Sequence, residues 1–159
     1  MLVSTWEPVG ALWGCRQRDV LIENSTARTG EIMEPANHDA MPADVLVVED
    51  DPIIALDFED TILGLGVKSV RSAGSVATAL DLIAVRAPDF ALLDVGLARE
   101  KSFAVAEKLQ ALKIPFAFVT GYGADKVPQV FADRPRLPKP CPTEALLVVL
   151  QRFVPKSQA

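Results

Sequence analysis

Short apolar runs alternate with longer amphipathic stretches over most of this chain. A short, mostly apolar run bounded by polar or turn residues predicts a buried strand. Five such runs occur, at 45–48, 67–73, 88–94, 115–119 and 136–138. Continuous apolar strands are typical of parallel sheets, whose two faces are both covered. The last run is brief and contains Pro138, so it is expected at a sheet edge.

The stretches between these runs carry apolar residues at helical spacing and predict five helices. The first opens at Pro52, where a missing amide hydrogen is harmless, and closes at Gly64 and Gly66. Ser75 is expected to cap the second helix, which ends before Pro88. The others are predicted at 100–112, weakly around 124–130, and from 142 to about 154.

Cys141 lies at the expected cap position of the last helix. Glu144, three residues further on, supplies half of a capping box. A thiol at a helix amino terminus can also have a lowered pKa. We therefore expect Cys141 to be a plain cap or, as the alternative, a reactive thiol.

Five strands alternating with five helices predict an α/β fold. It would be a doubly wound parallel sheet with right-handed crossovers and helices on both faces. At this size we expect the flavodoxin-like strand order 2-1-3-4-5. That order brings the carboxyl ends of strands 1, 3, 4 and 5 together at one edge, where open α/β sheets place their chemistry.

Composition narrows the possible functions. The 159 residues carry a net charge of −5, and the basic residues are scattered, which argues against nucleic acid as a partner. No apolar run approaches the ~20 residues that a membrane span requires. The two cysteines, Cys15 and Cys141, lie far apart without metal-ligand spacing, so a reduced cytoplasmic setting is expected. The single histidine, His38, leaves little for histidine-based chemistry.

Residues 1–43 differ from the rest of the chain. They hold both tryptophans, Trp6 and Trp13, but residues 24–42 are polar and turn-rich without a helical or strand period. We interpret this part as a largely disordered extension, or as the result of a start codon placed too early, with Met33 or Met41 as the true start. The alternative is a docking arm anchored by the two tryptophans. Residues 156–159 are expected to form a short tail.

Reactive side chains follow four of the predicted strands. Glu49 and Asp50 follow the first, Asp94 ends the third, Thr120 ends the fourth and Lys139 follows the fifth. Three carboxylates close together repel one another and need a cation, for which Mg²⁺ with oxygen ligands is the simplest choice. A hydroxyl donor and an ammonium opposite them suit a phosphoryl group. Asp94 is then expected to be a nucleophile for covalent phosphorylation.

The chain here resembles the receiver domains of bacterial two-component response regulators, over about residues 44–155. Residues 45–52 are similar to the opening acidic motif of that family, and residues 92–94 to its phosphoacceptor strand. Thr120 matches the family's hydroxyl residue. Lys139 matches its lysine, which a typically cis proline follows.

The resemblance implies a role for each residue of the site. Asp94 would be the phosphoacceptor and a metal ligand, Asp50 a direct ligand of Mg²⁺, and Glu49 its partner through water. Gly96 would supply a backbone carbonyl to the ion. Asp51 lies outside this metal set and is expected to favour the start of the following helix.

Residues 115–123 look more specifically like the FATGUY subfamily of receivers, with Val119 in place of an alanine. Members are usually stand-alone receivers that work with HWE-type or related histidine kinases. No output domain follows residue 159 and residues 1–43 are poor in core residues, so we expect no DNA-binding output. The family's aromatic switch position, three residues before Lys139, is occupied by Arg136. Tyr122, flanked by Gly121 and Gly123, is the expected replacement as switch, together with Thr120.

The expected function is therefore that of a single-domain receiver. It accepts a phosphoryl group on Asp94 from a sensor histidine kinase or phosphotransfer protein, and it signals through protein–protein interaction rather than as an enzyme with a separate substrate. One alternative is a pseudo-receiver that binds partners without phosphorylation. The other is an aspartyl-phosphate phosphatase of the haloacid dehalogenase kind, although residues 49–51 do not supply its Asp-x-Asp pattern.

Overall fold

The computed structural model describes residues 41–121 and 126–153 of this chain. Most of the predicted extension, Tyr122 and the predicted tail at 156–159 lie outside the described residues. No helix among the described residues is long and apolar enough to cross a membrane.

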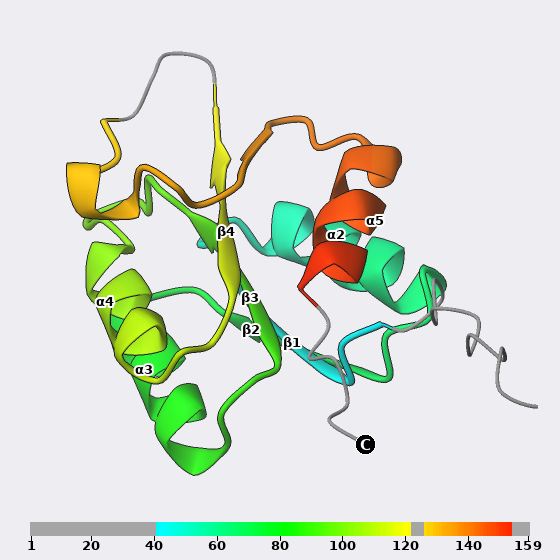
Figure 1. Cartoon of the computed structure of the whole chain (residues 1–159), viewed down its shortest axis with the longest axis horizontal. Coiled ribbons are helices and arrows are strands. Elements are labelled where there is room, and N and C mark those ends of the chain that lie inside the picture. Colours follow the sequence, from blue (N-terminus) through cyan, green and yellow to red (C-terminus); the bar gives the residue numbers. More distant parts are fainter. Residues whose placement is uncertain (1–40, 122–125, 154–159) are drawn as a thin grey trace, which may run out of the picture. The chain divides into compact units, whose positions relative to one another are not determined.

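Five parallel strands form one sheet in the order β2-β1-β3-β4-β5. In Figure 1 the sheet lies between two groups of helices. The strands are β1 (Asp44–Val48), β2 (Ser69–Ala73), β3 (Phe90–Asp94), β4 (Phe116–Thr120) and β5 (Arg136–Pro138). The predicted flavodoxin-like topology is therefore confirmed, and the proline-containing strand β5 lies at the edge, as expected.

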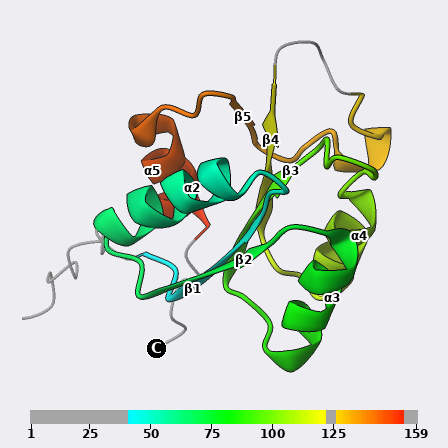
Figure 2. The same cartoon turned by 180° about the vertical axis from the view of Figure 1, so that it is seen from behind.

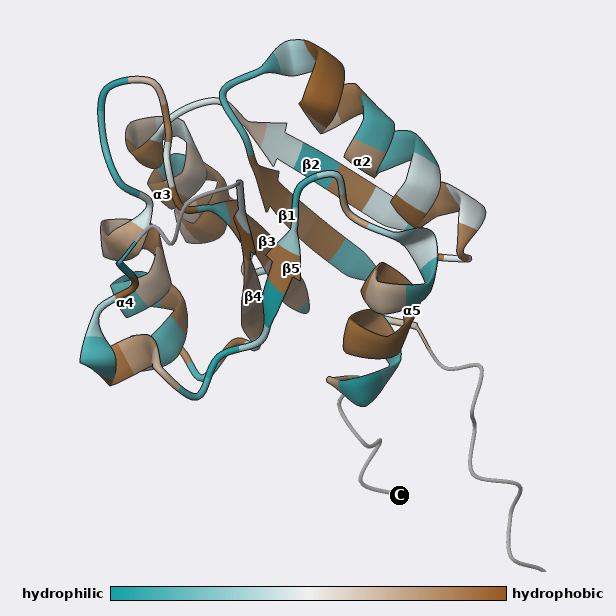
Figure 3. Ribbon diagram, turned by 90° about the horizontal axis from the view of Figure 1, so that it is seen from above, coloured by the Kyte–Doolittle hydropathy of each residue, from teal (hydrophilic) through white to brown (hydrophobic). Residues whose placement is uncertain are grey.

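Helices cover both faces of the sheet, α2 (Pro52–Gly64) and α5 (Thr143–Arg152) on one, and α3 (Val76–Val85) and α4 (Phe103–Ala111) on the other. Figure 2, from behind, shows the same division. Successive side chains of a strand point to opposite faces, so each strand contributes to both cores. Along β1, Val45 and Val47 pack toward α2 and α5, whereas Leu46 and Val48 pack toward α3 and α4. The central strands accordingly appear mostly brown in Figure 3.

Two helices begin with a side-chain cap, at Asp51, which was expected to favour the helix start, and at Ser75, which was expected as a cap. Asp51 is the N-cap of α2, and its side chain accepts hydrogen bonds from the amides of Ile53 at 2.8 Å and Ile54 at 3.3 Å. Ser75 caps α3 by accepting from the amide of Thr78 at 3.2 Å. These side chains satisfy amide groups that have no partner within the helix.

The connection between β4 and β5 differs from the prediction of a helix around 124–130. Residues 122–125 lie outside the described part, and residues 126–128 are not helical. A single 3₁₀ turn, η1 (Gln129–Phe131), follows them. Pro128 has an extended ψ of 146° and disfavours helical backbone at Val127 before it, so the helix cannot extend through this point. Phe131, fully buried, packs beside Phe116 and Phe118 in the core under α4.

Two further boundaries were predicted wrongly. α4 begins at Phe103 rather than residue 100, because Glu100 instead accepts a 2.9 Å hydrogen bond from the amide of Val76 at the start of α3. α5 begins at Thr143, with Pro142 as the N-cap and no side-chain cap. The Cys141 thiol donates to the Pro142 carbonyl at 3.7 Å instead of capping the helix. Burial also raises the pKa of Cys141, contrary to the alternative of a reactive thiol.

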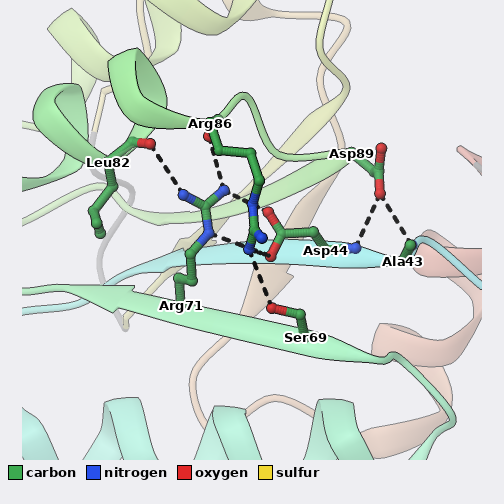
Figure 4. A network of polar contacts seen from close by, with 7 residues as sticks. All are labelled: Ala43, Asp44, Ser69, Arg71, Leu82, Arg86 and Asp89. Carbon is green, nitrogen blue, oxygen red and sulfur yellow. Dashed lines mark hydrogen bonds and ion pairs between the residues drawn. The ribbon is translucent and has the colours of Figure 1, made fainter.

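A charged network at the start of β1 joins this strand to β2 and to the end of α3 (Figure 4). Asp44, at the start of β1, forms ion pairs with Arg71 and, at 2.9 Å, with Arg86. Arg71 also donates to the carbonyls of Leu82 at 3.0 Å and Arg86 at 2.9 Å, at the C-terminal end of α3. Burial alone would raise the pKa of Asp44, but hydrogen bonds and charge from Arg71, with smaller help from Ser69 and Arg86, lower it below its ordinary value. The network ties α3 to β1 and β2.

Candidate functional site

Three carboxylates meet at the carboxyl edge of the sheet. Glu49 and Asp50 follow β1, and Asp94 is the last residue of β3, which pairs directly with β1. One carboxylate oxygen from each of the three lies within 4.8 Å of the others. Glu49 is 4% and Asp94 6% exposed, so their charges are poorly solvated. Such a cluster is stable only with a compensating cation or with some protonation.

Lys139 supplies positive charge to this cluster. Its ammonium Nζ lies 2.6 Å from Glu49 Oε2 and 2.7 Å from Asp94 Oδ2. The lysine reaches this place because it directly follows β5 and because its amide donates to the Thr120 carbonyl at 2.9 Å. The Lys139–Pro140 peptide bond is cis, as the family resemblance implies.

The protonation of Lys139 and Glu49 reflects opposing effects. Burial would lower the pKa of Lys139, but its hydrogen bonds to Asp94 and Glu49 and their charges raise that pKa, so the ammonium form is retained. Burial raises the pKa of Glu49, and the Asp94 charge adds to the effect. Lys139 and the amide of Asp51, which donates to Glu49 Oε1 at 3.1 Å, offset only part of it.

Backbone amides from the loop after β3 also bind the carboxylates. The Gly96 amide donates to Asp94 Oδ1 at 3.1 Å, and the Ala98 amide donates to Asp50 Oδ2 at 3.1 Å. The loop therefore links the end of β3 to the acidic pair that follows β1. Every non-proline residue carries an amide, so no sequence pattern marks Ala98 for this role.

Thr120 ends β4 beside the lysine. It is half-buried and lines a cavity of about 360 Å³ together with Gly121, Pro138, Lys139 and Pro140. A hydroxyl and an ammonium thus border one open space next to the carboxylates. Tyr122, the expected partner of Thr120 in switching, lies outside the described residues, and Arg136 is exposed on β5.

The donor set suits a hard divalent cation. Mg²⁺ prefers oxygen ligands and takes one or two carboxylates while keeping several waters. Glu49, Asp50 and Asp94 supply oxygens within reach of one ion, and the half-buried Asp50 faces solvent through which the ion could enter. Lys139 already pairs with two of the three carboxylates, so an ion would share them with the ammonium.

These features define a doubly wound α/β domain with a carboxylate–lysine site at the carboxyl edge of its sheet. The sequence profile described as the response regulator receiver domain matches residues 45–151. The chain belongs to this family, whose members are signalling domains of two-component systems and typically bind Mg²⁺ and undergo phosphorylation. The predicted membership of the receiver-domain family is thereby confirmed.

Similar solved structures and one curated protein agree with this assignment. The solution structure of SdrG from Sphingomonas melonis Fr1 is 39% identical, with 71% of this chain and 97% of that chain covered and a TM-score of 0.63. A second structure, described as the BeF3-activated conformation of SdrG from Pseudomonas melonis Fr1, is 40% identical over 69% and 96% of the two chains, with a TM-score of 0.60.

The curated relative is the phyllosphere-induced regulator PhyR of Methylorubrum extorquens. It is 27% identical over 109 residues, which cover 65% of this chain and 41% of PhyR. The chain thus matches less than half the length of this relative.

Proposed function

We propose that this chain is a receiver that accepts a phosphoryl group on Asp94 and signals through phosphorylation-dependent protein–protein interaction. The observation that carries the proposal is the meeting of Asp94 with Glu49, Asp50 and Lys139 at one edge of the sheet. Asp94 is the member of this set that ends the central strand β3, beside the lysine and facing the acidic pair.

In the proposed reaction a carboxylate oxygen of Asp94 attacks the phosphorus of a phosphohistidine. A P–O bond forms while the P–N bond breaks, and the electron pair leaves with the donor imidazole. The Lys139 ammonium then neutralises charge on the phosphoryl oxygens, and the Thr120 hydroxyl donates a hydrogen bond to them. Asp50 and Asp94, with Glu49 through water and the Gly96 carbonyl, would hold Mg²⁺, which supplies further positive charge.

The phosphodonor in this proposal is a sensor histidine kinase, of the HWE or a related type, or a phosphotransfer protein in the cytoplasm. Residues 115–123 support membership of the FATGUY subfamily. The likeness to SdrG supports a phosphorylation-driven change, because trifluoroberyllate is a chemical mimic of a phosphoryl group on aspartate and one SdrG structure is described as BeF3-activated.

Intact-mass spectrometry tests the phosphoacceptor. The wild-type chain, incubated with acetyl phosphate and Mg²⁺, is expected to gain one phosphate, and Asp94→Asn is expected to gain none. Asp89→Asn is the matched control, because Asp89 precedes the same strand and its side chain accepts hydrogen bonds from the backbone amides of Ala43 and Asp44. An adduct that persists in Asp94→Asn would refute the assignment, and no adduct in the wild type would favour a pseudo-receiver.

The proposed readout uses Thr120 and Tyr122. Thr120 moves toward the phosphoryl group, and Tyr122 on its glycine-flanked segment takes the place of the aromatic switch. Exposed Arg136 cannot fill an apolar slot, because an unpaired buried guanidinium is costly. Tyr122→Ala should keep Asp94 phosphorylation but reduce the phosphorylation-dependent amide NMR shifts around Gln129–Phe131. A full wild-type shift pattern in that variant would place the switch elsewhere.

A further inference from the structure

A second pocket lies at the amino-terminal edge of the sheet, away from the phosphoacceptor site. Its volume is about 260 Å³, and it is lined by Gln110, Lys113, Ile114, Pro115, Arg134 and Phe153. The end of α4, the turn into β4, the segment before β5 and the end of α5 thus border it. Pro115 immediately precedes β4 and Arg134 precedes β5, whereas Thr120 and Lys139 lie at or beyond the other ends of these strands.

The backbone at Lys113 is strained. α4 ends in a Schellman motif, with hydrogen bonds from the Lys113 amide to the Gln110 carbonyl at 3.0 Å and from the Ile114 amide to the Leu109 carbonyl at 2.9 Å. The motif places Lys113 in the left-handed region, at φ 59°. The same motif ends α2, but there the corresponding residue is Gly66, at φ 102°. A residue with a side chain resists this conformation, so the lysine is kept at an energetic cost.

One polar atom on each of two pocket side chains also lacks a hydrogen-bond partner among the described residues. Gln110 Oε1 and Arg134 Nε are both buried, and neither has a hydrogen-bond partner within residues 41–121 and 126–153. The Arg134 guanidinium lies over the Phe116 ring, 4.8 Å from its centroid, and Nε is 3.8 Å from Asp133 Oδ1, too far for a hydrogen bond. Unsatisfied buried polar atoms are rare and point to a missing partner.

Charge and size together indicate what this partner is. Lys113 and Arg134 face the pocket, and the Arg152 guanidinium lies over the ring of Phe153. The C-terminal ends of α4 and α5 carry partial negative charge, but the α4 carbonyls of Leu109 and Gln110 are already bonded in the Schellman motif. Lys113 and Arg134 together outweigh these partial charges and the exposed carboxylate of Asp133 beside Arg134. The volume lies below the ~300 Å³ lower limit of typical small-molecule sites, so it suits a single side chain better than a cofactor.

We propose that this pocket binds an acidic residue in a peptide segment of a partner protein. The carboxylate of a glutamate or aspartate pairs with Lys113 and with the Arg134 guanidinium, while a peptide amide donates to Gln110 Oε1. The carboxylate is an acceptor for the Arg134 Nε–H group, and the peptide amide is a donor for Gln110 Oε1, so both unpaired atoms gain a partner. Both unpaired atoms are shielded from solvent, so the side chains rotate slightly as the peptide enters. The Arg134 side chain is 26% exposed and therefore accessible to it.

NMR titration of the ¹⁵N-labelled full chain tests the proposal. The probe is an acetylated, amidated peptide Gly-Asp-Glu-Asp-Gly, with Gly-Asn-Gln-Asn-Gly as its uncharged match and acetate as the small anion. The acidic peptide is expected to shift the Arg134 Nε–H signal and the Lys113 and Ile114 amides in a saturable manner. No such shift, or equal affinity for the uncharged peptide, would refute the site. Equal affinity for acetate would show a small-anion site rather than a peptide site.

Substitution at Lys113 separates binding from folding. Lys113→Gly relieves the left-handed strain, so it should raise the melting temperature while weakening peptide affinity by about tenfold, the effect of one lost charge-assisted hydrogen bond. Lys108→Ala is the matched control, because it removes an exposed positive charge from the same helix outside the pocket. Unchanged affinity in Lys113→Gly, or an equal loss in Lys108→Ala, would overturn the assignment. Phosphorylation of Asp94 should be unaffected in both variants.

Discussion

Replacing Lys139 by methionine tests how the carboxylate cluster is stabilised. The change keeps much of the aliphatic side chain but removes the ammonium that bonds Glu49 at 2.6 Å and Asp94 at 2.7 Å. Breaking a fully buried ion pair costs about 3–5 kcal/mol. The Lys139 side chain is 21% exposed, so water screens part of the interaction, and we expect a loss of about 2–3 kcal/mol in the free energy of unfolding at neutral pH.

This loss corresponds to a melting temperature about 10 °C lower for a domain of this size, measurable by calorimetry without added metal. The pH dependence has a defined sign. The folded pKa of Glu49 is raised above its ordinary 4.5, so the folded state holds a proton that the unfolded state has already released. The contribution of Glu49 to stability therefore falls as the pH rises from about 4.5 through the raised folded pKa. Without Lys139 the pKa rises further, so the difference between variant and wild type should shrink as the pH is lowered.

Added Mg²⁺ should also shrink the difference, because an ion shared by the three carboxylates replaces the lost charge. Lys108→Met, an exposed lysine on α4, is the control and should melt within about 2 °C of the wild type. The reasoning is refuted if Lys139→Met is as stable as the wild type. It is refuted equally if the loss is the same at neutral pH, in acid and with Mg²⁺, since repulsion among the carboxylates would then not be its cause.

Three further predictions concern other parts of the fold. Asp44→Asn should destabilise the domain by about 2 kcal/mol at pH 7. The folded pKa of Asp44 lies below the ordinary 3.8, so the wild type should lose this contribution as the pH falls through the folded value. Denaturant titrations at several pH values should show that the variant lacks this part of the pH dependence of unfolding free energy. Gly66→Ala, at φ 102°, should cost about 1 kcal/mol in urea unfolding, and no loss would contradict the strain argument. In calorimetric Mg²⁺ titrations, Asp50→Ala should weaken affinity more than Glu49→Ala, and equal affinities in all three proteins would place the ion elsewhere.

The parts of the fold that the sequence predicted are those set by local pattern. The apolar runs that became β1, β3 and β4 are buried on both faces, so their hydrophobicity alone identifies them. Parallel strands bring their carboxyl ends to one edge, and this rule alone predicts Asp94 beside the acidic pair. The cap Ser75 and the helix-start role of Asp51 were likewise predictable, because a helix start depends on a few neighbouring residues.

What the sequence could not predict depends on contacts between distant residues or on backbone groups. The pairing of Asp44 with Arg71 and Arg86 joins residues 27 and 42 positions apart, and nothing in the local pattern marks them as partners. The amide of Ala98 binds Asp50 through a group that every non-proline residue carries. The prediction of a helix around 124–130 is wrong for a local reason instead, because Pro128 disfavours helical backbone at the residue before it.

The charge balance of the site connects its resting arrangement to the proposed chemistry. With Glu49, Asp50 and Asp94 ionised, Lys139 leaves the cluster at a net charge of about −2. Phosphorylation would replace the single charge of one carboxylate by the ~2 charges of a phosphoryl group and so add about one more negative charge. The Lys139 ammonium cannot pair with the phosphoryl group and with Glu49 equally well at the same time. A divalent ion would return the cluster to near neutrality and free Lys139 from Glu49 and Asp94. On the proposed function, the same ammonium would then turn toward the phosphoryl oxygens.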